Sequence, residues 1–313
     1  MTRLVTYERG LAPLGPAVAA IGVFDGVHLG HQELVRDAID IAHERGVLSV
    51  VITFDRDPDR VVQPDSAAPQ LLELEDKLSF LAALDPDVVL VVPFDASVAS
   101  MAPEAFVDDI VLAACSPVVV LVGHDFRFGS GARGDVFVLS SIGDSHGFSV
   151  LPRTLVEIGG APVTSTRIRA LVTAGDVKSA TELLGRPHRV RGRTMIGRGV
   201  GTALGIPTAN VHPHTYAAVP ADGVYAAYAT VLGRMYGAGV AVGVPPTFPE
   251  ATSAVEVHLL DFDDGDLHGE EIAVDFVSRI REQRVFKTEL ELSSAIRTDI
   301  DTAREALRDD HPW

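Results

Sequence analysis

Two histidines stand three residues apart in the segment GVFDGVHLGH, residues 22–31, where an apolar run gives way to helical spacing. In a first helical turn, His28 and His31 share one face, beside free backbone N–H groups and the positive end of the helix dipole. Imidazoles placed there can donate hydrogen bonds to phosphate oxygens as negative charge builds up. The segment predicts an anion site. The alternatives are a plain helix cap carrying two surface histidines, and a metal pair, for which no third ligand stands at suitable spacing.

A second segment, VGHDFRFGSGARGD at 122–135, follows another apolar run. It offers a carboxylate, Asp125, and two aromatic rings, Phe126 and Phe128, beside a glycine-rich loop. In a parallel sheet the carboxyl ends of the strands meet at one edge, so we expect this segment to lie near the histidine pair.

A third segment, TSTRIRALV at 164–172, carries Ser165 and Thr166 ahead of Arg167 and Arg169. Hydroxyl groups that cap a helix beside arginines form an anion site, although alone this pattern is typical of an ordinary N-cap with surface arginines. With the two segments above, it describes one cleft.

The second half of the chain contains GRGVGTALGIPTANV at 197–211. Its glycines can let backbone N–H groups wrap phosphates, and Thr208 and Asn210 offer oxygen ligands suited to Mg²⁺. The alternative is a glycine-rich hairpin that ends in a polar turn.

The segment AVEVHLLDF, 254–262, has the alternation of a strand, with Val255 and Val257 on one face and Glu256 and His258 on the other. A carboxylate within an apolar strand costs free energy unless it has a partner or a task. By itself, Glu256 is as readily an exposed strand residue as a functional one.

The elements that must position these residues change in type along the chain. Continuous Val/Ile/Leu runs alternate with helical spacing in the first part, which predicts a parallel sheet covered on both faces, a Rossmann-like arrangement. The expected strands are 17–24, 48–54, 87–94, 116–123 and 148–156, and the expected helices are about 30–45, 73–84, 103–114 and 134–146.

Near LLGRPHRV, residues 183–190, the pattern changes to short strand candidates separated by Gly and Pro, with no helix pattern between them. This predicts an antiparallel barrel or sandwich, followed by a terminal helix in TELELSSAIRTDIDTAREALRDD. We therefore expect two domains, 1–186 and 187–313, that differ in fold class: α/β followed by β.

Composition narrows the classes of function. The net charge of −17 argues against nucleic acid as a partner, and no apolar run is long enough to span a bilayer. The start, MTRLVTYERG, lacks a basic-then-apolar secretion pattern, so we expect a cytoplasmic protein. The single cysteine, Cys115, is expected to be a buried small hydrophobe. Composition leaves the oligomeric state open, a homo-oligomer included.

The strings GVFDGVHLGH, VGHDFRFG and TSTRIR together resemble the nucleotidyltransferase module of bacterial bifunctional riboflavin kinase/FAD synthetases, and the second half resembles their kinase module. The resemblance implies an FMN adenylyltransferase domain before a riboflavin kinase domain of barrel form, using ATP and Mg²⁺ on riboflavin and FMN and yielding FAD. It implies that Glu256 is the catalytic base of the kinase and that His28 and His31 contact ATP phosphates. The remaining implied residues bind ligands: ATP in the first half by Gly22, Phe24, Asp25, Gly26, Gly30, Ser165, Thr166 and Arg169; nucleotide or flavin by Asp125, Phe126 and Phe128; ATP in the kinase half by Gly197, Gly199, Gly201, Gly205 and Pro207; Mg²⁺ by Thr208 and Asn210.

The resemblance has departures at five positions. Asp57 stands where the family usually has the histidine of Pro-His-Pro, and the others are Val200, Thr202, Pro245 and His268. They indicate a divergent member. The alternatives are a paralogue with one active half or altered nucleotide or flavin specificity, and a flavin-binding regulator without turnover.

Overall fold

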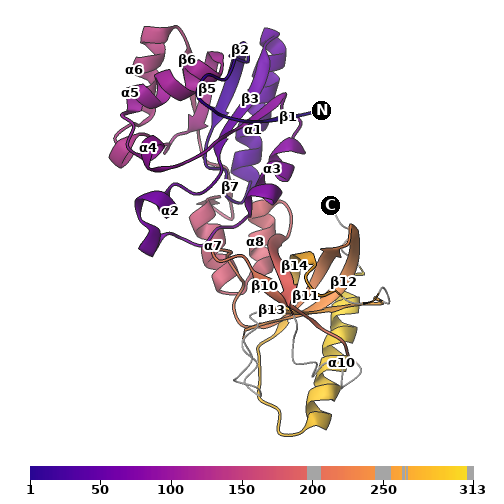
Figure 1. Cartoon of the computed structure of the whole chain (residues 1–313). Coiled ribbons are helices and arrows are strands. Elements are labelled where there is room, and N and C mark those ends of the chain that lie inside the picture. The colour runs from indigo at the N-terminus through magenta and orange to yellow at the C-terminus, as the bar shows by residue number, and fades with distance from the viewer. Residues whose placement is uncertain (196–205, 244–254, 263–264, 266, 309–313) are drawn as a thin grey trace. The chain divides into compact units, whose positions relative to one another are not determined.

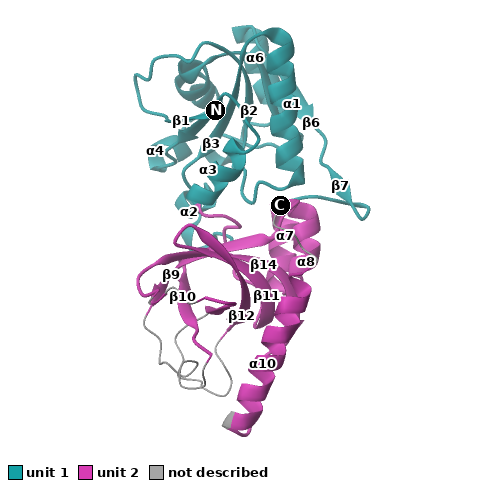
Figure 2. Cartoon of the chain, turned by 90° about the vertical axis from the view of Figure 1, so that its right-hand side faces the viewer, with its two compact units in different colours: residues 1–68, 74–164 teal, residues 69–73, 165–313 magenta. Residues whose placement is uncertain are grey.

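The computed structural model describes residues 1–195, 206–243, 255–262, 265 and 267–308 (Figure 1). The chain divides into two compact units, one of residues 1–68 and 74–164 and one of residues 69–73 and 165–313 (Figure 2). Each unit has its own sheet and its own hydrophobic core. A domain boundary near residue 186 remains a prediction.

A six-stranded parallel sheet forms the centre of the first unit, in the order β1-β4-β3-β2-β5-β6. This confirms the expected parallel sheet. The strands are β1 Arg3–Thr6, β2 Pro16–Ile21, β3 Leu48–Phe54, β4 Val88–Val92, β5 Ser116–Gly123 and β6 Ser149–Arg153.

Helices cover both faces of this sheet, which is why its strands read as continuous apolar runs. Helices α5 and α6 pack on one face through the core of the unit, and α1 lies on the other (Figure 1). The helices are α1 Leu29–Arg45, α2 Asp59–Val62, α3 Leu74–Ala82, α4 Ala96–Ala99, α5 Pro103–Phe106 and α6 Val136–His146; α5 continues as a π-helical segment, Val107–Leu112. Shorter elements are the 3₁₀ turns Pro64–Ser66 and Ser130–Ala132 and the two-residue strands β7 Glu157–Ile158 and β8 Ala161–Pro162.

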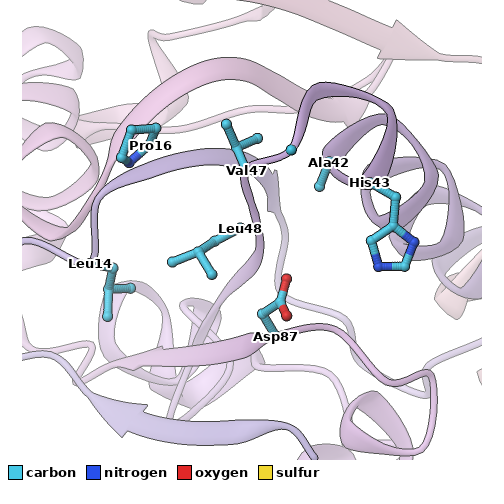
Figure 3. Close-up of a pocket in the computed structure, with 8 residues that line it drawn as sticks. Leu14, Pro16, Ala42, His43, Val47, Leu48 and Asp87 are labelled. Carbon is cyan, nitrogen blue, oxygen red and sulfur yellow. The ribbon is translucent and has the colours of Figure 1, made fainter.

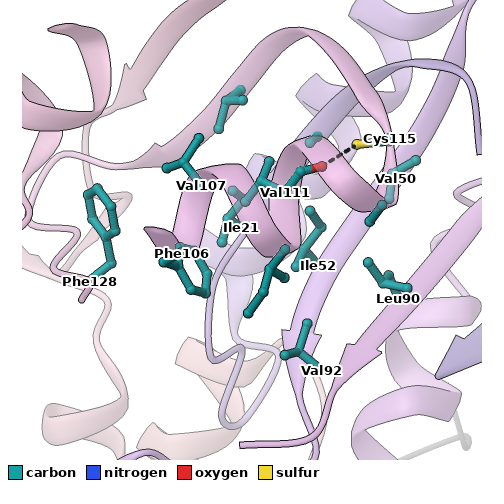
Figure 4. Packing of buried hydrophobic residues seen from close by; sticks show 14 of the residues in the cluster. Ile21, Val50, Ile52, Leu90, Val92, Phe106, Val107, Val111, Cys115 and Phe128 are labelled. Atoms are coloured by element: carbon teal, nitrogen blue, oxygen red, sulfur yellow. Dashed lines mark hydrogen bonds between the residues drawn. The ribbon is translucent and has the colours of Figure 1, made fainter. Parts of the chain in front are cut away.

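Branched aliphatic side chains of the central strands and aromatic rings from the connections form the core of the first unit (Figure 4). Cys115 is fully buried there, and its thiol donates a hydrogen bond to the carbonyl of Val111 at 3.5 Å. Burial raises the pKa of this thiol to about 12. Cys115 therefore behaves as the expected small hydrophobe.

The strand order reverses between β2 and β5, which are neighbours in the sheet although β3 and β4 come between them in the chain. In open α/β sheets, ligands bind at the carboxyl ends of the strands beside such a reversal. GVFDGVHLGH follows β2 and VGHDFRFG spans the end of β5. The topology therefore brings these two segments to the same edge.

The second unit contains a closed antiparallel barrel in the order β10-β13-β12-β11-β14-β9, as expected from the short strand candidates. Its strands are β9 His188–Met195, β10 Ala209–Pro213, β11 Gly223–Val231, β12 Arg234–Val242, β13 Val255–Leu259 and β14 Glu271–Arg281. Helices α7 Ser165–Thr173 and α8 Val177–Leu184 precede the barrel, and α10 Glu289–Ala306 packs on β11, β12 and β14. Strand β10 was not predicted. It closes the barrel by pairing with both β9 and β13.

Candidate functional site

The turn between β2 and α1 has an unusual backbone. Phe24, Gly26 and Val27 all have positive φ angles, of 56°, 83° and 40°. A positive φ is costly for Phe and for the β-branched Val, so the surrounding contacts must hold the turn in place. Side-chain hydrogen bonds contribute: the Thr53 hydroxyl donates to the carbonyl of Val23 at 3.1 Å, and the Gln32 amide donates to that of Val27 at 2.9 Å.

His28 is the N-cap of α1, and its Nδ1 accepts the backbone N–H of His31 at 3.3 Å. The two imidazoles stack with ring centroids 3.6 Å apart, and the ring of Phe24 meets His31 edge-on at 5.2 Å. The structure thus brings the predicted pair together. His28 is a helix cap, as one alternative had it, but it is only 4% exposed and is not a surface histidine.

Gly30 lies between the two rings in sequence and is close to both His28 and the chain ahead of α7. A Cβ at Gly30 would lie 3.3 Å from the His28 ring and 3.8 Å from the carbonyl oxygen of Val163. Any side chain there would press on the imidazole, so the small residue keeps the stacked pair in place.

The electrostatic surroundings keep His31 neutral at pH 7. Burial lowers the pKa of His31 well below 6.5, and the nearby charges of His28 and Lys77 lower it further. The His31 Nδ1 is buried and has no hydrogen-bond partner among the residues that the structure describes. A neutral imidazole has one donor and one acceptor nitrogen, so His31 can exchange a hydrogen bond with a ligand that reaches its ring.

Lys77 of α3 is a residue that the sequence analysis missed. Its side chain is 5% exposed, and its ammonium group donates to the carbonyl oxygens of Phe54 at 2.6 Å and Val23 at 3.2 Å. These carbonyls stand where β3 and β2 end, beside the turn that leads to the histidines. The sequence indicates it only weakly, as a lysine within the helix expected at 73–84.

Asp57, the departure from the family pattern, is half-buried, and its Oδ1 accepts the backbone N–H of Asp59 at 3.1 Å. It therefore helps to start the short helix α2. Its negative charge also raises the pKa of Lys77, as do the charges of Asp25 and Asp55.

The loop after β5 places its three candidates differently. Asp125 is exposed, Phe126 is half-buried, and Phe128 is buried in the core, where its ring stacks on Phe126 at 5.4 Å and contacts Phe106 at 5.9 Å. Asp125 is thus open to a ligand, whereas the packing of Phe128 already explains its presence. A role in nucleotide or flavin binding stays a prediction for all three.

Ser165, Thr166 and Arg169 lie in α7, within the second compact unit. Ser165 is the first residue of the helix, as the N-cap pattern predicted to within one position. The Arg169 guanidinium donates to the carbonyl of Pro69 at 2.7 Å. Whether these residues share a cleft with the histidine pair remains a prediction.

In the barrel, Glu256 and Asn210 are directly opposite each other in the pairing of β13 with β10. Such pairs share one face of the sheet, with Cβ atoms roughly 5 Å apart. Val255, Val257 and Leu259 are buried on the inner face, whereas Glu256 is half-buried on the outer one. The register therefore brings together the predicted base and a predicted metal ligand that lie 46 positions apart in the sequence.

The segment that carries Pro207 and Thr208 is tied to the same strand. His258, two residues after Glu256 and on the same face, donates from Nδ1 to the carbonyl of Pro207 at 2.8 Å. Thr208 and Asn210 are both half-buried. The candidates Gly197, Gly199, Gly201 and Gly205 lie outside the described residues, as do the departures Val200, Thr202 and Pro245; His268 is described and exposed.

The donor chemistry around Asn210 fits Mg²⁺. A hydroxyl, a side-chain amide and a carboxylate supply only oxygen ligands, the type that this cation prefers, and Mg²⁺ usually completes its shell with water and substrate phosphates. Among the described residues, no cluster of three or more His, Cys, Asp or Glu side chains has metal-binding geometry.

A hollow of about 520 Å³ lies at the amino ends of β2, β3 and β4, opposite the carboxyl ends that precede the histidine pair (Figure 3). It is lined by Leu14, Pro16, Ala42, His43, Gly46, Val47, Leu48 and Asp87. The Asp87 carboxylate already accepts the backbone N–H and the hydroxyl of Ser49, each at 2.8 Å. The predicted site residues are all absent from its walls, so this hollow is separate from the histidine pair.

Among the helices that the structure describes, none combines the length and the apolar character that a bilayer span requires.

Comparison with known proteins assigns a family to each part of the chain. Residues 12–167 match the FAD synthetase family, and residues 184–307 match the riboflavin kinase family. Bifunctional riboflavin kinase/FMN adenylyltransferases are similar over nearly the whole chain. That of Escherichia coli K12 is 35% identical over 94% of both chains, that of Pseudomonas fluorescens 36% identical over 95% of this chain and 96% of its own, and that of Bacillus subtilis 35% identical over 93% and 92%.

A solved structure from Streptococcus pneumoniae, titled a macrolide-efflux protein, superposes with a TM-score of 0.84 at 29% identity and covers 97% of this chain and 98% of its own. Two family models together span most of the sequence, and relatives above 30% identity cover more than nine-tenths of it. Both agree with the order of an α/β unit before a barrel. The chain therefore belongs to the bifunctional riboflavin kinase/FMN adenylyltransferase family.

Proposed function

We propose that this chain phosphorylates riboflavin to FMN with ATP and then adenylylates FMN with a second ATP to give FAD and pyrophosphate. The observation that carries the kinase step is the placement of Glu256 opposite Asn210 on the outer face of the barrel. Family membership supports both steps, because the similar proteins are named for both activities.

In the kinase step, an alcohol of riboflavin attacks the γ-phosphorus of ATP and ADP leaves. A neutral hydroxyl is a poor nucleophile, so Glu256 accepts its proton as the new oxygen–phosphorus bond forms. Asn210 and Thr208 would hold Mg²⁺, which supplies charge neutralisation at the ATP phosphates. His258 fixes the backbone at Pro207 and so keeps Thr208 beside the strand that carries Glu256.

In the adenylyl transfer, an oxygen of the FMN phosphate attacks the α-phosphorus of ATP, and the bond to pyrophosphate breaks. The attacking phosphate is already ionised and needs no base. It needs its repulsion with ATP reduced and its approach held in line. His28 and His31, at the positive end of α1, serve this purpose as hydrogen-bonding groups, and Ser165, Thr166 and Arg169 would bind other phosphate oxygens.

The test is chromatography of the products formed by the full chain from riboflavin, ATP and Mg²⁺. Appearance of FMN followed by FAD supports the proposal. FMN alone would indicate a paralogue with only the kinase half active, a reading that the departure at Asp57 favours. A chain that binds flavin and forms neither product would instead be a regulator without turnover.

A further inference from the structure

Lys77 is buried where a lysine is unusual. Lysines are almost never fully buried without a partner, because removing an ammonium group from water is costly. Here two backbone carbonyls partner it, those of Phe54 at 2.6 Å and Val23 at 3.2 Å. These residues belong to different strand ends, so a single side chain on α3 joins the chain after β2 to the chain after β3.

The ammonium group also lies within electrostatic range of several charged side chains. They are three carboxylates and one guanidinium: Asp25 before α1, Asp55 and Asp57 after β3, and Arg60 in α2. Lys77 also lowers the pKa of His31 in α1. Asp25 is itself buried. The Arg56 guanidinium pairs with Asp55 at 2.7 Å, and removal of Lys77 would shift the remaining balance at this edge toward negative charge.

That balance matters because the incoming substrates are anions. Carboxylates repel an approaching phosphate chain, most strongly where burial lowers the effective dielectric constant, so removing a cation from among them would increase that repulsion. An ammonium group that is already hydrogen-bonded supplies the compensating charge without further reorganisation.

We propose that Lys77 is a positioning residue for adenylyl transfer, which clamps the Val23 and Phe54 carbonyls so that the histidine-bearing turn keeps its strained shape, and which offsets the charges of Asp25, Asp55 and Asp57 beside the phosphates. The inference rests on the proposed adenylyl transfer and concerns that step alone. It predicts that the protonated form of Lys77 is the competent one.

The protonation state supplies a readout that a purely structural role would not move. Burial lowers the pKa of Lys77 to about 8, although Asp25 and then Asp57 and Asp55 raise it in part. Raising the pH through this value removes the cation. For FAD formation from FMN, kcat/KM should therefore fall above about pH 8 in the free enzyme, by roughly tenfold per pH unit once the group is mostly deprotonated.

Two substitutions separate the charge from the fold. Lys77→Met keeps an unbranched apolar chain but removes the cation, and kcat/KM should drop on the order of 10²-fold at pH 7 and lose its alkaline limb. Lys77→Arg keeps the charge at every accessible pH. The fall of kcat/KM at alkaline pH should therefore move to higher pH in this variant, even if kcat/KM at pH 7 is reduced. The control is Lys178→Met, which removes an exposed lysine from α8 and should leave the profile unchanged.

A second measurement does not depend on turnover. NMR titration of the His31 imidazole should show its pKa rising in Lys77→Met and staying low in Lys77→Arg, because Lys77 is one of the charges that lower it. If the wild-type chain makes no FAD, the proposed adenylyl transfer fails, while this titration still tests the electrostatic effect of Lys77 on the histidine pair. An unchanged His31 titration in Lys77→Met, or a wild-type alkaline limb in that variant, would overturn the inference. If Lys77→Met does not fold, Lys77→Arg decides alone: a fall of kcat/KM at the same pH as in the wild type would overturn the inference.

Discussion

His28 has two tasks in this structure, and two substitutions can separate them. Its ring caps α1 by accepting the N–H of His31, and it stacks on the His31 ring at 3.6 Å. His28→Ala removes both contacts, whereas His28→Asn keeps a short side chain that can cap the helix. Both variants remove the imidazole that we propose for phosphate binding.

The expected effects differ in size. Loss of an N-cap costs about 1 kcal/mol, and loss of a stacked aromatic pair adds roughly 1 kcal/mol. His28→Ala should therefore destabilise the first turn of α1 by about 2 kcal/mol, and His28→Asn by about 1 kcal/mol. For FAD formation, removal of one preorganised donor costs about 10²–10³-fold in kcat in both variants.

Local stability is read from amide hydrogen exchange of residues 25–45, because the chain has two units and its global unfolding need not be two-state. Turnover is read from FMN-to-FAD conversion, with riboflavin phosphorylation on the same chain expected to stay near its wild-type rate. His43→Ala, an exposed histidine in the last turn of the same helix, is the matched control. If His28→Asn recovers FAD formation together with exchange protection, the ring is only a cap and the phosphate role is wrong.

Three further predictions concern the barrel unit. Glu256→Gln should lower FMN formation by roughly 10²–10⁴-fold and leave FMN-to-FAD conversion intact, whereas equal loss of both activities would point to misfolding. A fragment of residues 187–313 should fold and make FMN but no FAD, and comparison with residues 165–313 shows how much α8, which packs on β9 and β14, adds to its stability; an insoluble shorter fragment would refute independent folding. His188 is buried with its pKa lowered to about 4, so the unfolded state binds the extra proton. The free energy of unfolding of the barrel unit should fall by up to about 3 kcal/mol as the pH drops from 6.5 to 4; amide hydrogen exchange of the barrel strands in His188→Gln should show a weaker dependence on pH.

The features predicted best from the sequence are those that depend on local sequence pattern. The strands at 48–54 and 116–123 have the predicted ends, because each is a short run rich in Val, Ile and Leu that is followed by charged or polar residues. Strand β1 was missed because it has only four residues, mostly exposed, and is held by pairing with β4. Strand β10 was missed because its sequence, ANVHP, has no apolar alternation, and its hydrogen bonds come from distant strands.

The candidate site residues divide in the same way, into those with a local sequence signal and those that only the fold brings together. The histidine pair was visible because its spacing and its position at a strand–helix junction are local properties. Lys77 was not, because a lysine in a helix is expected at the surface, and only the sheet brings the Val23 and Phe54 carbonyls to it. Phe128 shows a different limit of local pattern: its place beside a glycine-rich loop suggested a ligand contact, which stays a prediction, while nothing in the sequence indicated that the ring packs in the core.

Under the proposed function, the two halves need opposite electrostatic surroundings, which gives a physical reason for two sites. A hydroxyl nucleophile requires a proton acceptor, and the Glu256 carboxylate is half-buried beside Asn210, on the outer face of the barrel. A phosphate nucleophile would be repelled by such a carboxylate. At the histidine turn, burial instead keeps His31 neutral and the ammonium group of Lys77 offsets the nearby acids. A single site built to withdraw a proton would raise the barrier for joining two anions, so one chain that performs both steps gains from keeping them on separate folds.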